Sequence, residues 1–337
     1  MRTNHINSTK WGVSASLTAV LLLWAAQAGA ETTYIVARAL VDPLAERLVQ
    51  NPVVEIDGNR IVSVEPNGVV PEDARSIDLG DATLVPGLAD VHAHLSWFAT
   101  DTNVSFMGVS HTDEAIRSVV NAEVLLMAGF TVVRNTGAGG YSDVSVRNAI
   151  NAGRIPGPRL KVSGQSLGIT GGHCDQNLLP KQYNLRNAAI ADGPWAVRAQ
   201  VREHKKYGVD LIKFCATGGM LSKGTSVGGR QYTMEEMRAI VDEAHTHGLH
   251  VAAHAHGPEG IRYAIEAGVD SIEHGSLIDD EGIAMAVKQG TFLTLDIYTS
   301  EYLVAEGAKV GFLPKMLEKA KIVNEQRYDI FRKVAES

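Results

Sequence analysis

A length of 337 residues is enough for one large α/β domain with an appendage, or for two domains. With 45% hydrophobic and 20% charged residues, the chain has the composition of a folded globular protein, which argues against intrinsic disorder. The formal net charge of −7 and the absence of Lys/Arg runs argue against a nucleic-acid-binding surface.

The first thirty residues have the pattern of a secretory signal peptide. Arg2 and Lys10 give a basic start, residues 15–26 (ASLTAVLLLWAA) are mostly apolar, and Ala28-Gly29-Ala30 supplies a small-residue cleavage site. The apolar run is too short to span a bilayer as a mature helix, which disfavours an uncleaved anchor. We therefore predict that residues 1–30 are removed, that the mature chain does not insert stably into a membrane, and that the protein is periplasmic or secreted.

Residues 31–84 have strand and turn patterns without a helical period. Apolar and polar residues alternate in YIVARALV, PVVEIDGNRIVSVEP and SIDLGDATLV. Turn signals occur at Asp57-Gly58-Asn59 and at Asn67-Gly68. This segment is predicted to be a small β-sandwich portion.

From residue 85 onward, strands and helices alternate. Strands are predicted at 88–94, 130–134, 159–163, 209–215, 250–254, 270–274 and 291–295. Helices are predicted at 113–128, 194–207, 233–248, 257–267, 278–289 and over most of 301–337. Such alternation implies a parallel sheet with helices outside it.

Two architectures fit these seven strand–helix units, an open doubly wound sheet and a (β/α)8 TIM-type barrel. Four polar residues end their predicted strands: His94, Lys213, His254 and His274. In a barrel these ends converge on one mouth, where active sites form. No G-x-G-x-x-G follows the first strand, which argues against a dinucleotide-binding sheet and a hydride-transfer enzyme. We predict a barrel over residues 85–337 whose eighth strand is missing.

The same strand ends carry residues that can bind metal ions. His92 and His94 would point to one face of a strand, and imidazole is the commonest protein ligand of zinc, although the pair alone could be a polar strand face. Lys213 lies in an apolar strand, where burial would lower the pKa of its amine. A neutral amine can take up carbon dioxide and become an anionic carbamate with two oxygens. Taken alone, Lys213 would be better interpreted as an ion-paired residue. Together with His254 and His274, it favours a site for two divalent metal ions, which we expect to be Zn²⁺.

Four motifs together resemble the amidohydrolase superfamily: HAH at 92–94, IKF-x-ATGG at 212–219, HAHG at 254–257 and IEHGS at 272–276. The likeness is to its imidazolonepropionase-like and Xaa-Pro dipeptidase (prolidase-like) branch and covers about residues 34–335. The preceding IDLGDATLVPGLADVHAHL is similar to that family's passage from β-sandwich to barrel.

The resemblance implies a role for each ligand. His92 and His94 match the ligands of one ion, His254 and His274 those of the second, and Lys213 the carboxylated lysine that bridges them. The implied activity is hydrolysis of amide or peptide bonds by hydroxide held between the ions, on Xaa-Pro dipeptides or N-acyl amino acids. A cyclic-amide hydrolase like imidazolonepropionase is the alternative, but that branch usually works with one metal and lacks the bridging lysine. The partners are then small molecules or dipeptides, and a homo-oligomer is left open.

Other residues near the predicted mouth have two interpretations each. His173, in TGGHCD, is a candidate substrate contact or a structural hydrogen-bonding residue. His256 is a substrate contact or an ordinary loop histidine. Tyr232 and Arg230 could bind a substrate carboxylate, although surface positions are slightly favoured.

The two cysteines, Cys174 and Cys215, could form one disulfide in an exported protein, since one lies in a loop and the other at a strand end. No sequence feature supports the pairing. Free, partly buried thiols are therefore the prediction.

The family's acid–base residue is an aspartate at the end of the eighth strand, and this sequence departs from that pattern. No GTD- or GSD-like strand follows residue 296; Asp296 ends the seventh strand, and Asp329 lies in a helical run. We therefore expect a fragment or truncated gene product with little turnover and a tendency to aggregate through exposed strand edges. A non-catalytic zinc-binding derivative is the alternative of a different class.

Overall fold

The computed structural model describes residues 32–337, so the predicted signal peptide lies outside the described residues. The chain divides into two compact units, one ending at Pro86 and one comprising Gly87–Ser337. None of the described helices is long and apolar enough to cross a membrane.

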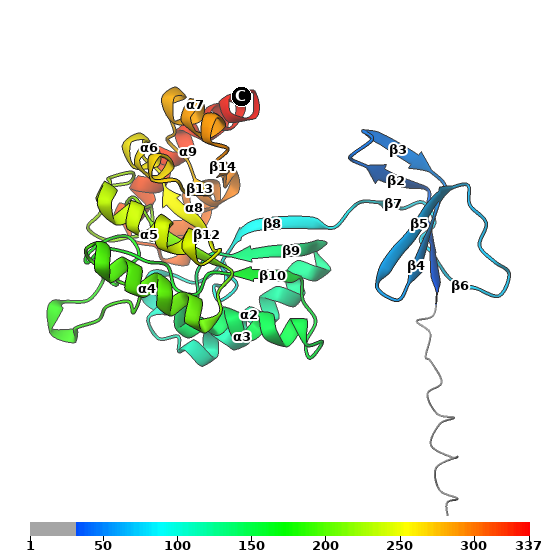
Figure 1. Ribbon diagram of the computed structural model, residues 1–337, viewed down its shortest axis with the longest axis horizontal. Helices are drawn as coiled ribbons and strands as arrows, with labels where there is room; N and C mark the ends of the chain where they lie inside the picture. Colours follow the sequence, from blue (N-terminus) through cyan, green and yellow to red (C-terminus); the bar gives the residue numbers. More distant parts are fainter. Residues whose placement is uncertain (1–31) are drawn as a thin grey trace, which may run out of the picture. The chain divides into compact units, whose positions relative to one another are not determined.

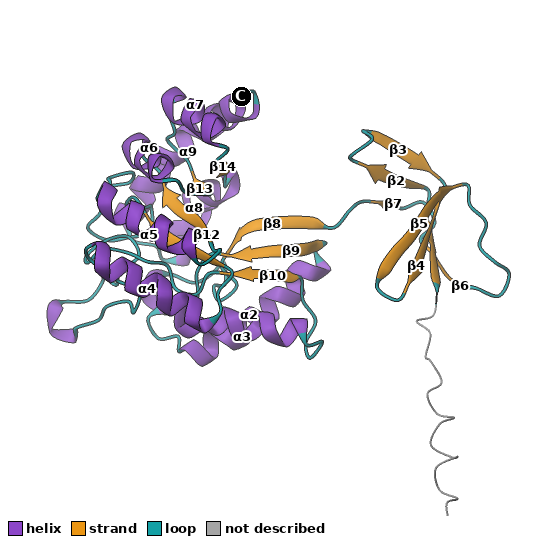
Figure 2. Cartoon of the chain, viewed as in Figure 1, coloured by secondary structure: helices purple, strands orange, loops and turns teal. Residues whose placement is uncertain are grey.

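The described part of the first unit consists of strands and turns (Figure 2). Its strands are β1 (Thr33–Val36), β2 (Ala39–Asp42), β3 (Arg47–Gln50), β4 (Pro52–Asp57), β5 (Arg60–Pro66), β6 (Arg75–Asp78) and β7 (Thr83–Leu84). They form a four-stranded sheet in the order β5-β4-β1-β6 and a three-stranded sheet in the order β3-β2-β7. The β4–β5 hairpin turns at the predicted Asp57-Gly58-Asn59, where Gly58 has a φ of 59°. Packing of the two sheets as a sandwich stays a prediction.

The second unit alternates strands and helices along the chain (Figure 1). Its strands are β8 (Leu88–Ala93), β9 (Phe130–Asn135), β10 (Arg159–Val162), β11 (Leu211–Cys215), β12 (His250–Ala255), β13 (Ser271–His274) and β14 (Phe292–Thr294). Its α-helices are α1 (Asn103–Phe106), α2 (His111–Met127), α3 (Ser142–Asn151), α4 (Pro194–Tyr207), α5 (Met234–Thr246), α6 (Pro258–Ala267), α7 (Asp280–Gln289), α8 (Ile297–Val310) and α9 (Pro314–Ala335). All seven predicted strands form within one or two residues of their predicted bounds.

The strands of this unit are parallel and follow chain order. They form a three-stranded sheet, β10-β9-β8, and a four-stranded sheet, β11-β12-β13-β14. A single parallel bridge between Leu167 and Phe214 brings the segment after β10 alongside β11. The structure therefore confirms an α/β unit of parallel strands, whereas a closed barrel stays a prediction.

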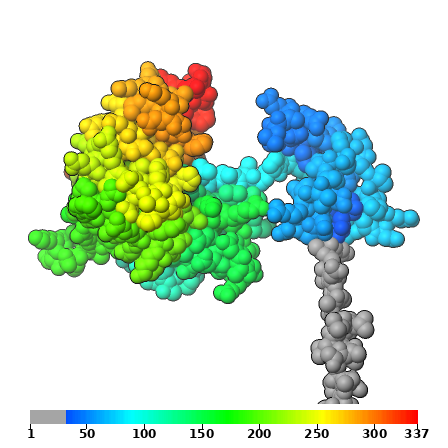
Figure 3. All heavy atoms as spheres, in the orientation of Figure 1, coloured from blue at the N-terminus to red at the C-terminus, as the bar shows by residue number. Residues whose placement is uncertain are grey.

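The core of the unit lies between the strands and the helices that cover them. Fully buried aliphatic side chains of β11 and β13 meet those of α5 and α6, among them Ile212, Ile272, Ile240 and Ile265. Helix α5 begins at a capping box, in which Thr233 and Glu236 bond to each other's backbone N–H. In the space-filling view the green and yellow segments that contribute this core form one continuous surface (Figure 3).

The structure differs from the predictions in two helices, α1 and α3, and in the cysteines. Helix α3 was not predicted, because SDVSVRNAIN is rich in Ser, Val and Asn, which are weak helix formers. The prediction of free thiols is wrong, because Cys174 and Cys215 form a disulfide with 6.1 Å between their Cα atoms. The pairing follows from the bridge at Leu167, which brings the loop carrying Cys174 beside β11.

Candidate metal centre

The register of the four-stranded sheet places three polar residues on one face. Cys215 pairs with His254, and His254 pairs with Glu273. Lys213 is two residues before Cys215 and therefore points the same way, because strand side chains alternate and paired residues share a face. Lys213, His254 and Glu273 are thus brought together by strand geometry alone.

His274 reaches the same space through an unusual backbone. Alternation along β13 would direct His274 with Ile272 toward the helices, away from Glu273. Instead His274 has a φ of 75°, in the left-handed region that non-glycine residues rarely adopt. Its imidazole centroid lies 4.6 Å from those of His92 and His254. Strained backbone of this kind is concentrated at functional sites.

The predicted ligands from separate strands form one continuous histidine cluster. The ring centroids of His92 and His94 are 5.3 Å apart, and His92 in turn contacts His274. His173 stacks on His254 at 4.2 Å between ring centroids. His92, His94, His254 and His274 therefore meet at one end of the parallel strands, as predicted, with His173 beside them.

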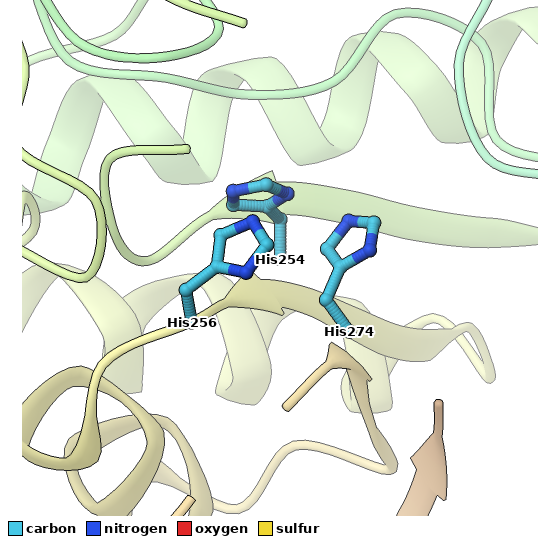
Figure 4. A group of neighbouring side chains, drawn as sticks. All are labelled: His254, His256 and His274. Carbon is cyan, nitrogen blue, oxygen red and sulfur yellow. The ribbon is translucent and has the colours of Figure 1, made fainter. Parts of the chain in front are cut away.

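His256 belongs to this cluster as well. Potential ligand atoms of His254, His256 and His274 all lie within 4.8 Å of one another, and Figure 4 shows the three imidazoles around a common space. The buried Nε2 of His254 has no hydrogen-bond partner among the described residues. Buried imidazole nitrogens without partners are costly unless a ligand engages them, so these residues fit a bound divalent ion.

Burial keeps these imidazoles in the neutral form that binds metals. Burial, reinforced by the positive charge of Lys213, lowers the pKa of His92 well below its ordinary value and that of His94 to about 4. Burial also lowers the pKa of His173 to about 3 and those of His254 and His256 well below the ordinary value. Near neutral pH the lone pairs of these nitrogens are therefore available to a cation.

Lys213 is buried, with only 3% of the residue exposed. Burial lowers the pKa of its amine to about 8, against the opposing effect of the Glu273 carboxylate. A substantial fraction of the amine is consequently neutral in mildly alkaline solution, which is the state that can react with carbon dioxide.

Comparison with known proteins identifies the family. Residues 83–333 match the amidohydrolase family. The chain belongs to that family. A solved Xaa-Pro dipeptidase with methionine in its active site is 34% identical, with a TM-score of 0.82, and the match covers 91% of this chain and 77% of that one. Ochratoxinase of Aspergillus niger is 34% identical over 215 residues, which are 59% of this chain and 44% of that protein. Imidazolonepropionase of Streptomyces avermitilis is 24% identical over 269 residues, covering 74% of this chain and 59% of that protein.

These shares show that the matched part of the chain spans about half the length of the curated relatives. The likeness to the dipeptidase is nevertheless long and close enough to support the predicted prolidase-like and imidazolonepropionase-like branch of the amidohydrolases.

In this amidohydrolase, Asp296 lies at the cluster, although it follows the seventh predicted strand and not an eighth. One carboxylate oxygen of Asp296 is 3.0 Å from Nδ1 of His274. Burial alone would raise the pKa of Asp296, but the imidazoles of His274, His256 and His92 lower it below its usual range. The sequence feature that could have identified Asp296 is its position just after β14, because residues at the ends of parallel strands form such sites.

The structure revises the interpretation of Tyr232 and Arg230. Tyr232 is not a surface residue: it is completely buried, packs against Phe214, and donates its hydroxyl hydrogen bond to the Ala191 carbonyl. This bond occupies the donor that a substrate carboxylate would require, so Tyr232 has a packing role here. Arg230 is part-exposed, pairs with Glu259 at 3.3 Å and lies over the Tyr263 ring, in agreement with a surface position.

The Gly-rich loop after β11 closes over the histidines. A Cβ atom on Gly219 would lie 2.7 Å from Nε2 of His173 and 2.8 Å from Nε2 of His254. Only glycine therefore allows the backbone to approach the cluster this closely. Lys319 of α9 holds the loop by donating to the carbonyls of Gly219, Ser222 and Thr225.

Proposed function

We propose that this protein is a binuclear metal-dependent hydrolase of C–N bonds. The observation that carries the proposal is the convergence of His92, His94, Lys213, His254 and His274 at one end of the strands, with the unpartnered Nε2 of His254 among them. The family's known chemistry fits this donor set, because neutral imidazoles and a carboxylated lysine are ligands for two zinc ions.

Each residue has a defined part in this proposal. His92 and His94 would hold one ion and His254 and His274 the other, and Lys213, carboxylated on its amine, would be their shared ligand. When bound, the ions would supply a nucleophile from water near neutral pH and polarise the scissile carbonyl. Asp296 is the carboxylate placed to hold His274, and Gly219 brings the loop backbone over the site, which limits the entry of water.

Amides with a free carboxylate are the proposed substrates, namely Xaa-Pro dipeptides or N-acyl amino acids. Support comes from the likeness to an Xaa-Pro dipeptidase and from a related prolidase structure that contains N-methylphosphonate-L-proline. A cyclic-amide hydrolase is the second candidate, favoured by the similarity to imidazolonepropionases. The buried Lys213 among the histidines favours the first candidate, because only a two-ion site uses a bridging lysine.

We propose that the protein is exported to the periplasm or secreted. The disulfide between Cys174 and Cys215 supports it, since disulfides persist in oxidising compartments such as the periplasm and the extracellular medium. The signal-like pattern of residues 1–30 points the same way.

The test is product formation with the chain in excess over substrate, so that slow cleavage is detected. The zinc-loaded chain would be incubated with Xaa-Pro dipeptides, N-acyl amino acids and a cyclic amide, and products identified by mass spectrometry. We expect cleavage of an open-chain amide that stops on chelation, returns with zinc, and is lost in His254→Asn. Product formation that neither chelation nor His254→Asn reduces would refute the proposal.

A further inference from the structure

A fully buried carboxylate lies directly behind the first histidine of the β8 pair. Glu273 is 0% exposed, and its Oε2 is 2.7 Å from Nδ1 of His92. The two residues come from different sheets and are separated by 181 positions in the sequence. Their contact therefore depends on the folded arrangement of β8 and β13.

The other oxygen of Glu273 is held by donors. Arg134 donates from Nη2 to Oε1 of Glu273 at 2.6 Å, and the Ser271 hydroxyl donates to the same oxygen at 2.6 Å. Arg134 also donates from Nε to the Val91 carbonyl at 2.6 Å and from Nη1 to the Ser271 hydroxyl at 3.1 Å. This guanidinium on β9 therefore fixes the carboxylate and, one residue from His92, the backbone of β8.

The donors and acceptors of these groups determine the tautomer of the His92 imidazole. An ionised carboxylate only accepts, and a guanidinium only donates. With Oε1 occupied by Arg134 and Ser271, Oε2 of Glu273 accepts from His92, so the imidazole proton must be on Nδ1. The lone pair is then on Nε2, the nitrogen that is left to face the cluster.

We propose that Arg134 and Glu273 form a positioning pair that sets the tautomer and orientation of His92 for metal binding. The proposal rests on the metal site of the proposed function and adds to it two residues that act through His92. Carboxylate partners of this kind hold metal-ligating histidines in many sites, and their loss weakens metal binding about 10–100-fold.

Replacement of Glu273 by glutamine gives a directional test. Arg134 and Ser271 can donate only to the oxygen of the new amide, so its NH₂ group must face Nδ1 of His92. Glu273→Gln should therefore move the imidazole proton to Nε2 and remove the lone pair that faces the cluster. Zinc titration should show one site per chain weakened by about 10–100-fold.

The tautomer can be measured without metal. Long-range ¹H–¹⁵N NMR of the metal-free protein labelled with ¹⁵N-histidine distinguishes the two forms, and the spectrum of His92→Asn assigns the signals. Wild type should show the Nδ1–H form at His92, and Glu273→Gln the Nε2–H form. An Nε2–H form in wild type would overturn the proposal, even where Glu273→Gln fails to fold.

Glu243→Gln is the matched control. Glu243 is also buried and accepts from two arginines, Arg198 and Arg202, and contacts His247 at 3.1 Å, on helix α5 and outside the cluster. The Glu243→Gln substitution should leave the His92 NMR signals and the zinc affinity unchanged. If Glu243→Gln and Glu273→Gln weaken zinc binding equally, the effect is a general loss of stability and the proposal fails. If wild type binds no zinc yet shows the Nδ1–H form, the proposed function fails and the positioning of His92 stands.

Discussion

Asp143 is a carboxyl group that the fold buries among neutral donors. Asn135 Nδ2 donates to it at 3.1 Å, and the backbone N–H groups of Gly164 and Val144 donate at 3.0 and 2.9 Å. Burial outweighs these hydrogen bonds and raises the pKa of Asp143 to about 6. The protonated form is therefore favoured in the folded state at mildly acidic pH.

Because the folded-state pKa is raised, the contribution of Asp143 to stability is fully present below about pH 4 and is lost as the pH rises through about 6. Relative to Asp143→Asn, which does not titrate, the wild type should lose up to about 3 kcal/mol of unfolding free energy across this range. Urea unfolding of both proteins between pH 4 and pH 7.5 measures the difference. A difference that is constant with pH would contradict the expectation.

At the scale of elements, the loop between β11 and α5 is shaped by the histidines beneath it. Gly219→Ala would place a methyl group against His173 and His254, and overpacking of this kind typically costs about 1–3 kcal/mol. We expect zinc binding weakened by about ten- to a hundredfold with the far-UV circular dichroism unchanged. Gly108→Ala, where the nearest neighbouring atom is 3.7 Å from the new Cβ, is the control. Equal zinc affinity in the two variants would contradict this role of the loop.

The disulfide joins two other elements, the loop after β10 and the end of β11. Its cysteines are 41 positions apart, and closing a loop of this size stabilises a folded chain by about 4 kcal/mol in the chain-entropy model. The double variant Cys174→Ala/Cys215→Ala should lose about that unfolding free energy, and a reducing agent should lower the wild type to the same level. Wild-type stability that is indifferent to the reducing agent would show that the pairing does not form.

At the scale of the whole molecule, local patterns predicted the strands well. Residue alternation and turn signals gave β8 to β14, and polar residues at strand ends gave His92, His94, Lys213, His254 and His274. The strands and the meeting of these side chains at one end of them could be predicted because residue alternation and the convergence of parallel strand ends follow from short-range geometry. The metal-binding role of the side chains stays a prediction.

Contacts that depend on tertiary structure could not be predicted from the sequence. The bond between Glu273 and His92 joins two sheets, and the disulfide depends on the path of a long loop. The left-handed backbone of His274 could not be inferred from IEHGS, where parity alone would have turned its imidazole away from the site. The burial of Tyr232 could not be predicted, because a loop motif gives no indication of which residues pack against it.

The most direct test of the account is the number of zinc ions bound by the chain. Purified protein would be loaded with zinc in the presence of bicarbonate, and the metal measured by inductively coupled plasma mass spectrometry. Four histidine ligands and a carboxylated Lys213 shared by both ions predict two ions per chain in the wild type and at most one in Lys213→Ala. Two ions in both proteins, or one ion that is unaffected by the substitution, would contradict the two-metal centre.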